Sequence, residues 1–142
     1  MRGTSRLLTF LLLLSLAACK FPADPEGTSD EVRGAVLKVG ALTQLQDADK
    51  RAVAQIARAF EAELQVVQDD PHRLFALLEQ GRLHIVAGQI PEDTPFRHSV
   101  ALSDPVGTLT LNGKTKQQVL ALRRGENAFL VTVNRALQEV AL

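Results

Sequence analysis

The sequence has little that can form a disulfide or an aromatic platform. Its 142 residues contain one cysteine, six phenylalanines and neither tryptophan nor tyrosine. A single cysteine excludes an internal disulfide framework, and few aromatic rings are present on which a sugar or a nucleobase could stack. Sixteen basic residues balance sixteen acidic ones, so the chain lacks the positive charge of a nucleic-acid-binding protein and no nucleic-acid partner is expected.

Patterns for catalysis or metal binding are also lacking. His72, His84 and His98 have no metal-ligand spacing and no cysteine beside them, and His84 is expected to be a satisfied, partly buried side chain in a strand. Ser99 and Ser103 lack the nucleophile elbow and the orienting acid of a hydrolase triad. The glycines form no phosphate-binding loop. The sequence therefore predicts a protein that is not an enzyme and uses neither a metal nor a cofactor.

The first nineteen residues are organised as an export signal. Two arginines precede an apolar run over residues 7–16, which is too short to span ~30 Å of hydrocarbon as a stable helix. Small residues then lead to Cys19 in the sequence Leu-Ala-Ala-Cys, which resembles the lipobox of bacterial lipoproteins. The resemblance implies cleavage before Cys19 and a diacylglyceryl group on its thiol, in many bacteria with a further acyl chain on the new amino terminus.

Lipidation of Cys19 predicts a protein of the cell envelope that is anchored to a membrane and faces the periplasm. Lys20 follows the cysteine in place of an aspartate, which by the sorting habit of lipoproteins favours the outer membrane over the inner one. The alternative is an ordinary secretory signal cleaved near Ala18, in which the cysteine is incidental.

Removal of the signal leaves 142 − 18 = 124 residues, which is the length of one domain. We expect residues 1–18 to be the signal peptide, residues 19–34 to be the lipidated cysteine with a tether, and residues 35–142 to form the domain. The tether is predicted because residues 20–33 contain two prolines, a glycine and four acidic residues without apolar periodicity.

Strand and helix patterns alternate along the domain. β-Branched and apolar runs predict strands, and apolar residues at helical spacing predict helices. Asp47 or Asp49 can cap the first of these helices, and Asp70 can cap the second one ahead of Pro71. The expected elements are strand 35–40, helix 49–62, strand 64–67, helix 71–81, strand 84–88, strands 108–111 and 116–122, and a helix starting near residue 126.

This order predicts an α/β fold. Strands that alternate with helices over about 55 residues are typical of a parallel, right-handed wound sheet. Asn112-Gly113 between the last two strands is a strong hairpin signal, because both positions of the turn need a positive φ. We therefore expect a single lobe with a mostly parallel sheet, helices on both faces and one β-hairpin.

Several motifs in this order resemble those of the bacterial extracellular solute-binding proteins of the polar-amino-acid type, the substrate-binding components of ABC transporters. Residues 74–81 (LFALLEQG) and 83–88 (LHIVAG) resemble the family's helix, glycine and strand, with His84 where the family has Asp. Residues 94–97 (TPFR) and 102–106 (LSDPV) resemble its "TPxR" and "FSDPY" segments. Short lipoproteins related to that family are the most similar.

The family's second lobe has no counterpart here. In full-length members the chain leaves the first lobe after the "FSDPY" segment, builds a second lobe and returns, whereas here only residues 106–118 separate exit from return. The resemblance implies a single lobe resembling a periplasmic binding protein of type 2, with Gly88, Thr94 and Arg97 at its site. Arg97 would clamp the carboxylate of an amino acid or another small carboxylate through two parallel hydrogen bonds, and an ABC permease would be the partner. Binding is expected to be weak, because one lobe cannot enclose a solute.

Two alternatives remain open. Arg97 can be a surface arginine paired with Asp93 or Asp104. The protein can be an envelope interaction module that docks on another envelope protein with its exposed half-cleft. Four basic residues also predict a locally basic hairpin end: Lys114, Lys116, Arg123 and Arg124. Such a cluster is ordinarily a solvated face, and otherwise a contact for lipid phosphate or a partner.

Overall fold

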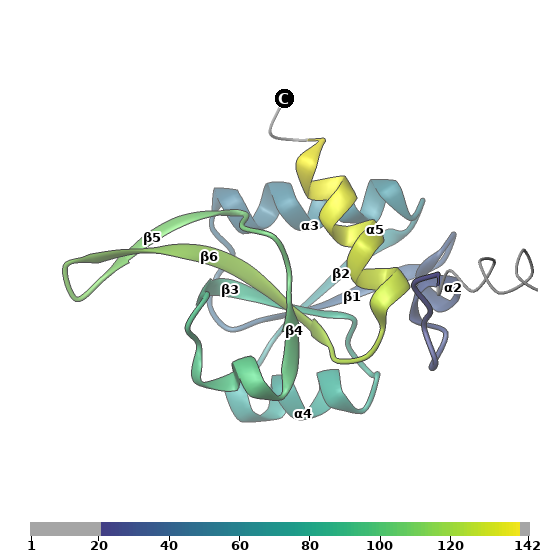
Figure 1. Ribbon diagram of the computed structural model, residues 1–142, viewed down its shortest axis with the longest axis horizontal. Coiled ribbons are helices and arrows are strands. Elements are labelled where there is room, and N and C mark those ends of the chain that lie inside the picture. Colours follow the sequence, from purple (N-terminus) through teal and green to yellow (C-terminus); the bar gives the residue numbers. More distant parts are fainter. Residues whose placement is uncertain (1–20, 140–142) are drawn as a thin grey trace, which may run out of the picture.

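A computed structural model of the chain describes residues 21–139 (Figure 1). The predicted signal peptide and Cys19 lie outside the described residues. The elements follow in the order α2 (Thr28–Val32), β1 (Val36–Ala41), α3 (Asp47–Ala59), β2 (Glu63–Gln68), α4 (Pro71–Glu79), β3 (Ile85–Pro91), η1 (Pro95–His98), β4 (Val100–Leu102), β5 (Gly107–Leu111), β6 (Lys114–Arg123) and α5 (Asn127–Gln138). Within residues 21–139 no helix is both long enough and apolar enough to cross a bilayer.

The six strands form one sheet in the order β2-β1-β3-β6-β4, and β5 pairs with β6. β2 and β3 run parallel to β1, whereas β6 runs antiparallel to β3, β4 and β5. Five strands therefore share one direction and β6 alone opposes them. The predicted fold, a single α/β lobe with a mostly parallel sheet and a hairpin, is confirmed. We call the end of the sheet at which β1, β2 and β3 begin the amino end, and the end at which they finish the carboxyl end.

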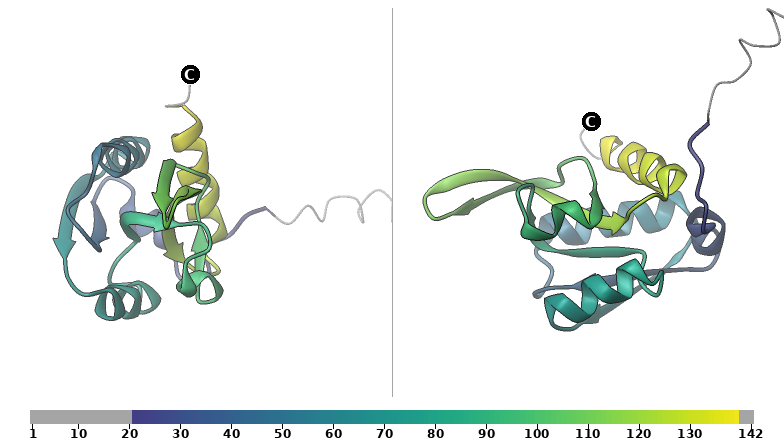
Figure 2. Two further views of the ribbon diagram at one scale, coloured as in Figure 1. Left: turned by 90° about the vertical axis from the view of Figure 1, so that its left-hand side faces the viewer. Right: turned by 60° about the horizontal axis from the view of Figure 1, so that its bottom comes forward.

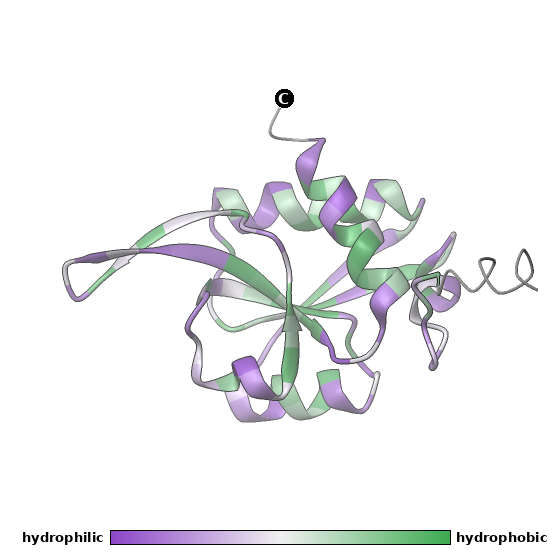
Figure 3. Cartoon of the chain, in the orientation of Figure 1, coloured by the Kyte–Doolittle hydropathy of each residue, from purple (hydrophilic) through white to green (hydrophobic). Residues whose placement is uncertain are grey.

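Helices cover both faces of the sheet, as predicted. α3 and α5 pack on one face and α4 on the other, above and below the sheet in Figure 1. On the first face Phe60 and Phe129 are fully buried, with ring centroids 5.2 Å apart. On the second face Leu74 and Leu78 of α4 pack in one cluster with Val86 of β3. Hydrophobic residues recur along the helices and the strands of the sheet, while polar residues dominate the hairpin tip (Figure 3).

The limits of α4 confirm the sequence signals. The Asp70 carboxylate accepts the Arg73 N–H at 3.1 Å, and Pro71 is the first helical residue. Gly81 follows the end of the helix with a φ of 71°, a conformation that costs glycine little. A side-chain cap, a proline at the first position and a terminal glycine thus fix this helix from its own sequence.

The capping prediction for α3 was wrong. The helix begins at Asp47, its N-cap is Gln46, and no side chain caps it. Asp49 is fully buried, and its Oδ2 atom accepts the Gln89 N–H from β3 at 3.3 Å. The Asp49 carboxylate therefore accepts a hydrogen bond from β3 and does not cap α3.

β5 and β6 form a hairpin arm, residues 107–118, that projects from the carboxyl end of the sheet (Figures 1 and 2). Asn112 and Gly113 in its turn have φ values of 50° and 74°, as the Asn-Gly pair predicted. The ladder between β3 and β6 ends at Gln118, and the Gln117 carbonyl accepts one further hydrogen bond, from the Glu92 N–H at 3.0 Å, so residues 114–116 have strand partners in β5 alone. The arm is therefore a two-stranded ribbon.

The basic cluster predicted for the hairpin end is not one surface. Lys114 and Lys116 lie on the arm, whereas Arg123 and Arg124 lie at the other end of β6, at the amino end of the sheet. Lys114 and Arg123 are nine positions apart along an extended strand, a distance of about 30 Å at ~3.4 Å per residue. The four basic residues are close in the sequence but lie at opposite ends of β6.

The first described segment lies against α5 and is not the free tether that was predicted. The Oδ1 atom of Asp24 accepts the Phe129 N–H at 2.8 Å. The Glu126 carboxylate, 2% exposed, accepts the N–H groups of Glu26 and Thr28, both at 3.0 Å. We call these contacts between residues 23–29 and residues 126–129 the clasp.

The sequence did not predict helix α2, which continues the clasp. Val32 at its end is fully buried in the core on the α3 side of the sheet. Among the acidic residues that favoured a tether up to residue 33, Asp24 accepts the N–H groups of Ser29 and Phe129, and Glu31 lies 3.9 Å from Lys38 Nζ. These residues are therefore part of the fold.

Candidate functional site

The topology places a candidate site at the carboxyl ends of β1 and β3. β1 is central, and the chain leaves it through α3 to reach β2 on one side and reaches β3 on its other side through α4. These two helices lie on opposite faces of the sheet. In open α/β sheets, the crevice where the winding reverses in this way is where ligands bind. The loops that follow β1 and β3 therefore border the candidate site.

Gly88, within β3, packs closely against the loop after β1. The pairing of β3 with β6 shifts register between Val86 and Ile90, and Gly88 takes a φ of 119° within this bulge. A Cβ atom at Gly88 would lie 3.0 Å from the backbone nitrogens of both Leu42 and Thr43. Position 88, one of the predicted site residues, therefore requires glycine, because the backbone of the loop after β1 comes too close for a Cβ atom. Gly88 is buried.

Thr94 and Arg97 occupy the segment that leads from β3 to β4. Thr94 is 4% exposed, and its hydroxyl accepts the Phe96 N–H at 3.4 Å at the start of η1. The Phe96 ring stacks on Phe75 of α4, with centroids 3.9 Å apart. Arg97 is exposed; its backbone N–H donates to the Thr94 carbonyl at 3.1 Å, and its side chain forms no hydrogen bond or ion pair among residues 21–139. Its guanidinium group remains available to an anion.

The two aspartates considered as partners of Arg97 pair with other residues. Asp93 pairs with Lys116 of the arm, and this hydrogen bond is the main reason why the pKa of the Asp93 carboxyl is lowered, with Arg97 contributing through its charge. The Asp104 carboxylate accepts a hydrogen bond from Gln138 at 3.3 Å. Neither aspartate forms an ion pair with Arg97 within the described residues.

Two buried polar groups near the root of the arm could not be predicted from the sequence. Asp49 is fully buried and Gln118 is 4% exposed, yet Asp49 Oδ1 and Gln118 Nε2 have no hydrogen-bond partner among residues 21–139. Gly107 lies close to Gln118 and to Ala48, the neighbour of Asp49 in the chain: its added Cβ atom would lie 3.4 Å from Ala48 Cβ and 3.7 Å from Gln118 Oε1. Buried polar atoms are almost always paired, so the root of the arm has an unused acceptor and an unused donor.

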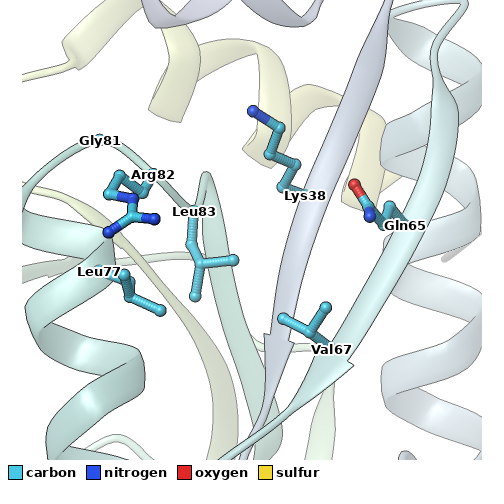
Figure 4. A pocket seen from close by; sticks show the side chains of 7 residues that line it. All are labelled: Lys38, Gln65, Val67, Leu77, Gly81, Arg82 and Leu83. Carbon is cyan, nitrogen blue, oxygen red and sulfur yellow. The ribbon is translucent and has the colours of Figure 1, made fainter.

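Two cavities of about 400 Å³ flank the outer strand β2 on opposite faces of the sheet. The first, shown in Figure 4, is lined by Lys38, Gln65, Val67, Leu77, Gly81, Arg82 and Leu83. The second is lined by Ala41, Thr43, Gln44, Leu45, Lys50, Val53, Leu64, Val66 and Gln68. Only the second reaches the loop after β1, and neither is lined by Gly88, Thr94 or Arg97. The three predicted site residues thus share one region of the chain without sharing either cavity.

His84, which takes the place of the family's Asp, is structural. Its side chain is 2% exposed, its Nδ1 atom accepts the Lys38 N–H at 3.0 Å, and its Nε2 atom lies 3.3 Å from Glu31 Oε1. No group of three possible metal ligands occurs within residues 21–139. The expectation of a buried histidine is confirmed, but only the Nδ1 atom is satisfied, because Nε2 has no hydrogen-bond partner of good geometry among residues 21–139.

His84 is expected to make stability depend on pH. Burial lowers the pKa of its imidazole, opposed by Glu31, so the unfolded chain takes up the proton first as the pH falls. Stability should therefore be complete above about pH 6.5, the ordinary value for histidine, and decrease below it toward the lowered pKa. Urea denaturation from pH 5 to 8 should show this loss, and His84→Asn, which keeps an acceptor for the Lys38 N–H, should reduce it. An unchanged pH profile in His84→Asn, with exposed His98→Asn as the control, would contradict this role.

Comparison with known proteins supports the fold rather than a close kinship. No family model matches the sequence, and no curated protein matches it. Solved structures do match. The arginine-bound form of domain 1 from TmArgBP, an arginine-binding protein of T. maritima, is 22% identical with a TM-score of 0.64, over 82% of this chain and 99% of that one. The substrate-binding protein of an amino acid ABC transporter is 12% identical with a TM-score of 0.62, over 75% and 93%.

The fold is similar to that of a single domain of amino-acid-binding proteins. A further match is the ancestral amino acid-binding protein AncCDT-1, a precursor of cyclohexadienyl dehydratase, at 12% identity and a TM-score of 0.65, over 75% of this chain and 89% of that one. These structures are mostly binding proteins, and one is a precursor of an enzyme. What this particular chain binds has to be argued from its own residues.

Proposed function

We propose that the chain is a membrane-anchored periplasmic lipoprotein of the ABC-transporter solute-binding type that binds an amino acid or another small carboxylate weakly through one lobe. The match with an isolated domain carries the proposal, because 82% of this chain covers 99% of a single domain that is itself arginine-bound. In that protein one domain of this fold holds an amino acid.

Arg97 supplies the chemistry for a carboxylate. Its exposed guanidinium has no partner among residues 21–139, and a guanidinium pairs with a carboxylate through two parallel hydrogen bonds. Gly88 lets the loop after β1 approach β3 closely, and Thr94 starts the short helix that carries Arg97. The two residues would act by positioning, while Arg97 would touch the solute. Affinity would be low because one face of the solute stays in water.

Substitution of Arg97 tests the solute site. Calorimetry with arginine and other common amino acids on the chain from Lys20 onward should detect a Kd on the order of 1 mM for at least one of them, and Arg97→Ala should weaken it about tenfold or more. Arg51→Ala, an exposed arginine on α3, should leave the Kd unchanged. Equal binding by Arg97→Ala, or no binding by any amino acid tested, would defeat the proposal.

Substitution of Cys19 tests the anchor. The sequence Leu-Ala-Ala-Cys supports lipidation, and stable attachment needs more than one acyl chain. Cys19→Ala should move the protein from the membrane fraction to the soluble one, and mass spectrometry of the wild type should find a diacylated or triacylated amino terminus. The wild-type protein in the soluble fraction with a free thiol would show that the signal is an ordinary secretory one.

A second candidate, an envelope interaction module, is favoured by the outer strand β2. All six residues of β2 are exposed, and Leu64, Val66 and Val67 are 37%, 44% and 40% exposed. An unprotected apolar edge strand is a template for pairing with another chain. Photo-crosslinking from position 66 in intact cells, together with a failure to bind any amino acid, would favour this candidate over solute binding.

A further inference from the structure

The clasp determines where the lipid joins the fold. Cys19 precedes Ala23 by four residues, a reach of about 14 Å at most. The Ala23 carbonyl accepts the Asn127 N–H at 3.1 Å, and Asp24 and Glu126 hold the next residues to the start of α5. A lipid on Cys19 would therefore keep the start of α5 close to the bilayer surface.

The start of α5 belongs to the amino end of the sheet. α5 follows β6, whose last residue, Arg123, pairs with Val100 at the start of β4, and whose Leu122 pairs with Ile85 at the start of β3. The arm leaves β6 at its opposite end. Both views that show the long axis place α2 and the arm at opposite ends of the molecule (Figures 1 and 2). The clasp and the candidate solute site thus lie at opposite ends of the sheet.

The amino end carries arginines that can bind phospholipid phosphate. Arg33, Arg82 and Arg124 are exposed in three turns at this end, among the exposed acidic residues Asp30, Glu31, Glu61 and Glu63. Arginine binds phosphate through two parallel hydrogen bonds, and one Arg124 nitrogen donates to the His98 carbonyl at 2.8 Å. Arg123 is half-buried, with Glu26 at 4.0 Å. Phe21, only two residues after Cys19, is 84% exposed, and an apolar ring at that position can enter the boundary between headgroups and acyl chains.

We propose that the amino end of the sheet lies against phospholipid headgroups and that the carboxyl end, with the arm, points away from the bilayer. The proposal rests on the lipid anchor proposed above. A solute or a permease would then reach the loops after β1 and β3 from the aqueous side. The arm tip stands about 30 Å from the headgroups along β6.

Fluorescence quenching in vesicles tests this orientation. The full lipidated chain is reconstituted in phosphatidylethanolamine and phosphatidylglycerol, and a cysteine is introduced by Asp30→Cys in α2 or by Lys114→Cys at the arm tip. Cys19 is the only native cysteine and lipid occupies its thiol, so each variant takes one fluorophore. Headgroup spin-labelled lipid should quench the label at position 30 several-fold more than the label at position 114, given about 30 Å between the two ends.

The outcomes separate the orientation from the anchor. Equal quenching of the two labels, or stronger quenching at position 114, in a protein that remains with the vesicles would overturn the orientation and leave the anchor intact. A parent chain that takes up the fluorophore at Cys19 and stays in the supernatant would overturn the anchor, and the orientation with it.

Discussion

Glu126→Ala is expected to lower the free energy of unfolding by about 3 kcal/mol, because the substitution breaks two charge-assisted hydrogen bonds and leaves a buried donor without a partner. The carboxylate is 2% exposed and accepts the N–H groups of Glu26 and Thr28 at 3.0 Å each. Thr28 is 5% exposed, so its N–H has little access to water once the carboxylate is gone. The Glu26 N–H is more exposed and can turn to solvent at lower cost.

Urea denaturation of the chain from Lys20 onward measures this effect, and hydrogen exchange identifies the region. The Thr28 amide should exchange faster in Glu126→Ala, since the clasp opens before the sheet does. Glu126→Gln keeps one oxygen acceptor and should lose only part of the stability. Glu79→Ala, at an exposed position at the end of α4, should change the free energy by less than about 0.5 kcal/mol. Equal stability of Glu126→Ala and Glu79→Ala would mean that the clasp is not needed.

The fold could be predicted from the sequence because its main signals are local. Strand and helix runs, the Asp70 cap and the Asn112-Gly113 turn each depend on residues close together in the chain. The right-handed winding rule then converts alternating elements into a parallel sheet. The three-residue strand β4 and the short helix η1 were not predicted, because runs of three or four residues carry no measurable periodicity.

Contacts between distant parts of the chain could not be predicted. Asp24 lies 105 residues from the amide that it accepts, and Asp49 accepts an amide 40 residues away. Read locally, these acidic residues resemble a solvated tether and a helix cap, because the sequence does not reveal which distant backbone groups need an acceptor. The same limit explains why four basic residues close in sequence were expected to form one cluster, although an extended strand separates them.

The roles of Gly88, Thr94 and Arg97 in solute binding stay predictions. Gly88 and Thr94 each have a structural role that explains the residue type. The Arg97 side chain is exposed and unpaired among residues 21–139, and its contact with a carboxylate stays a proposal. The buried, unpaired atoms of Asp49 and Gln118 at the root of the arm add polar groups that only the tertiary structure brings together.

Gly88→Ala is expected to destabilise the protein by about 3 kcal/mol, which combines the strain of a positive φ in a residue with a Cβ atom and a backbone collision. Gly88 has a φ of 119°, and the new Cβ atom would lie 3.0 Å from the nitrogens of Leu42 and Thr43. Backbone atoms cannot rotate away as a flexible side chain can. The loop after β1 must therefore shift, so solute binding by the candidate site should weaken together with stability.

Gly113→Ala separates the two causes. Gly113 at the arm tip also has a positive φ, 74°, but no atom lies within 4 Å of its added Cβ, so only the conformational cost of about 1 kcal/mol applies. In urea denaturation Gly88→Ala should therefore be clearly less stable than Gly113→Ala, and only Gly88→Ala should change amino-acid binding. If the two variants lost the same stability, the close approach of β3 to the loop after β1 would not be what requires glycine at position 88, and the candidate site would lose the contact that holds this loop against β3.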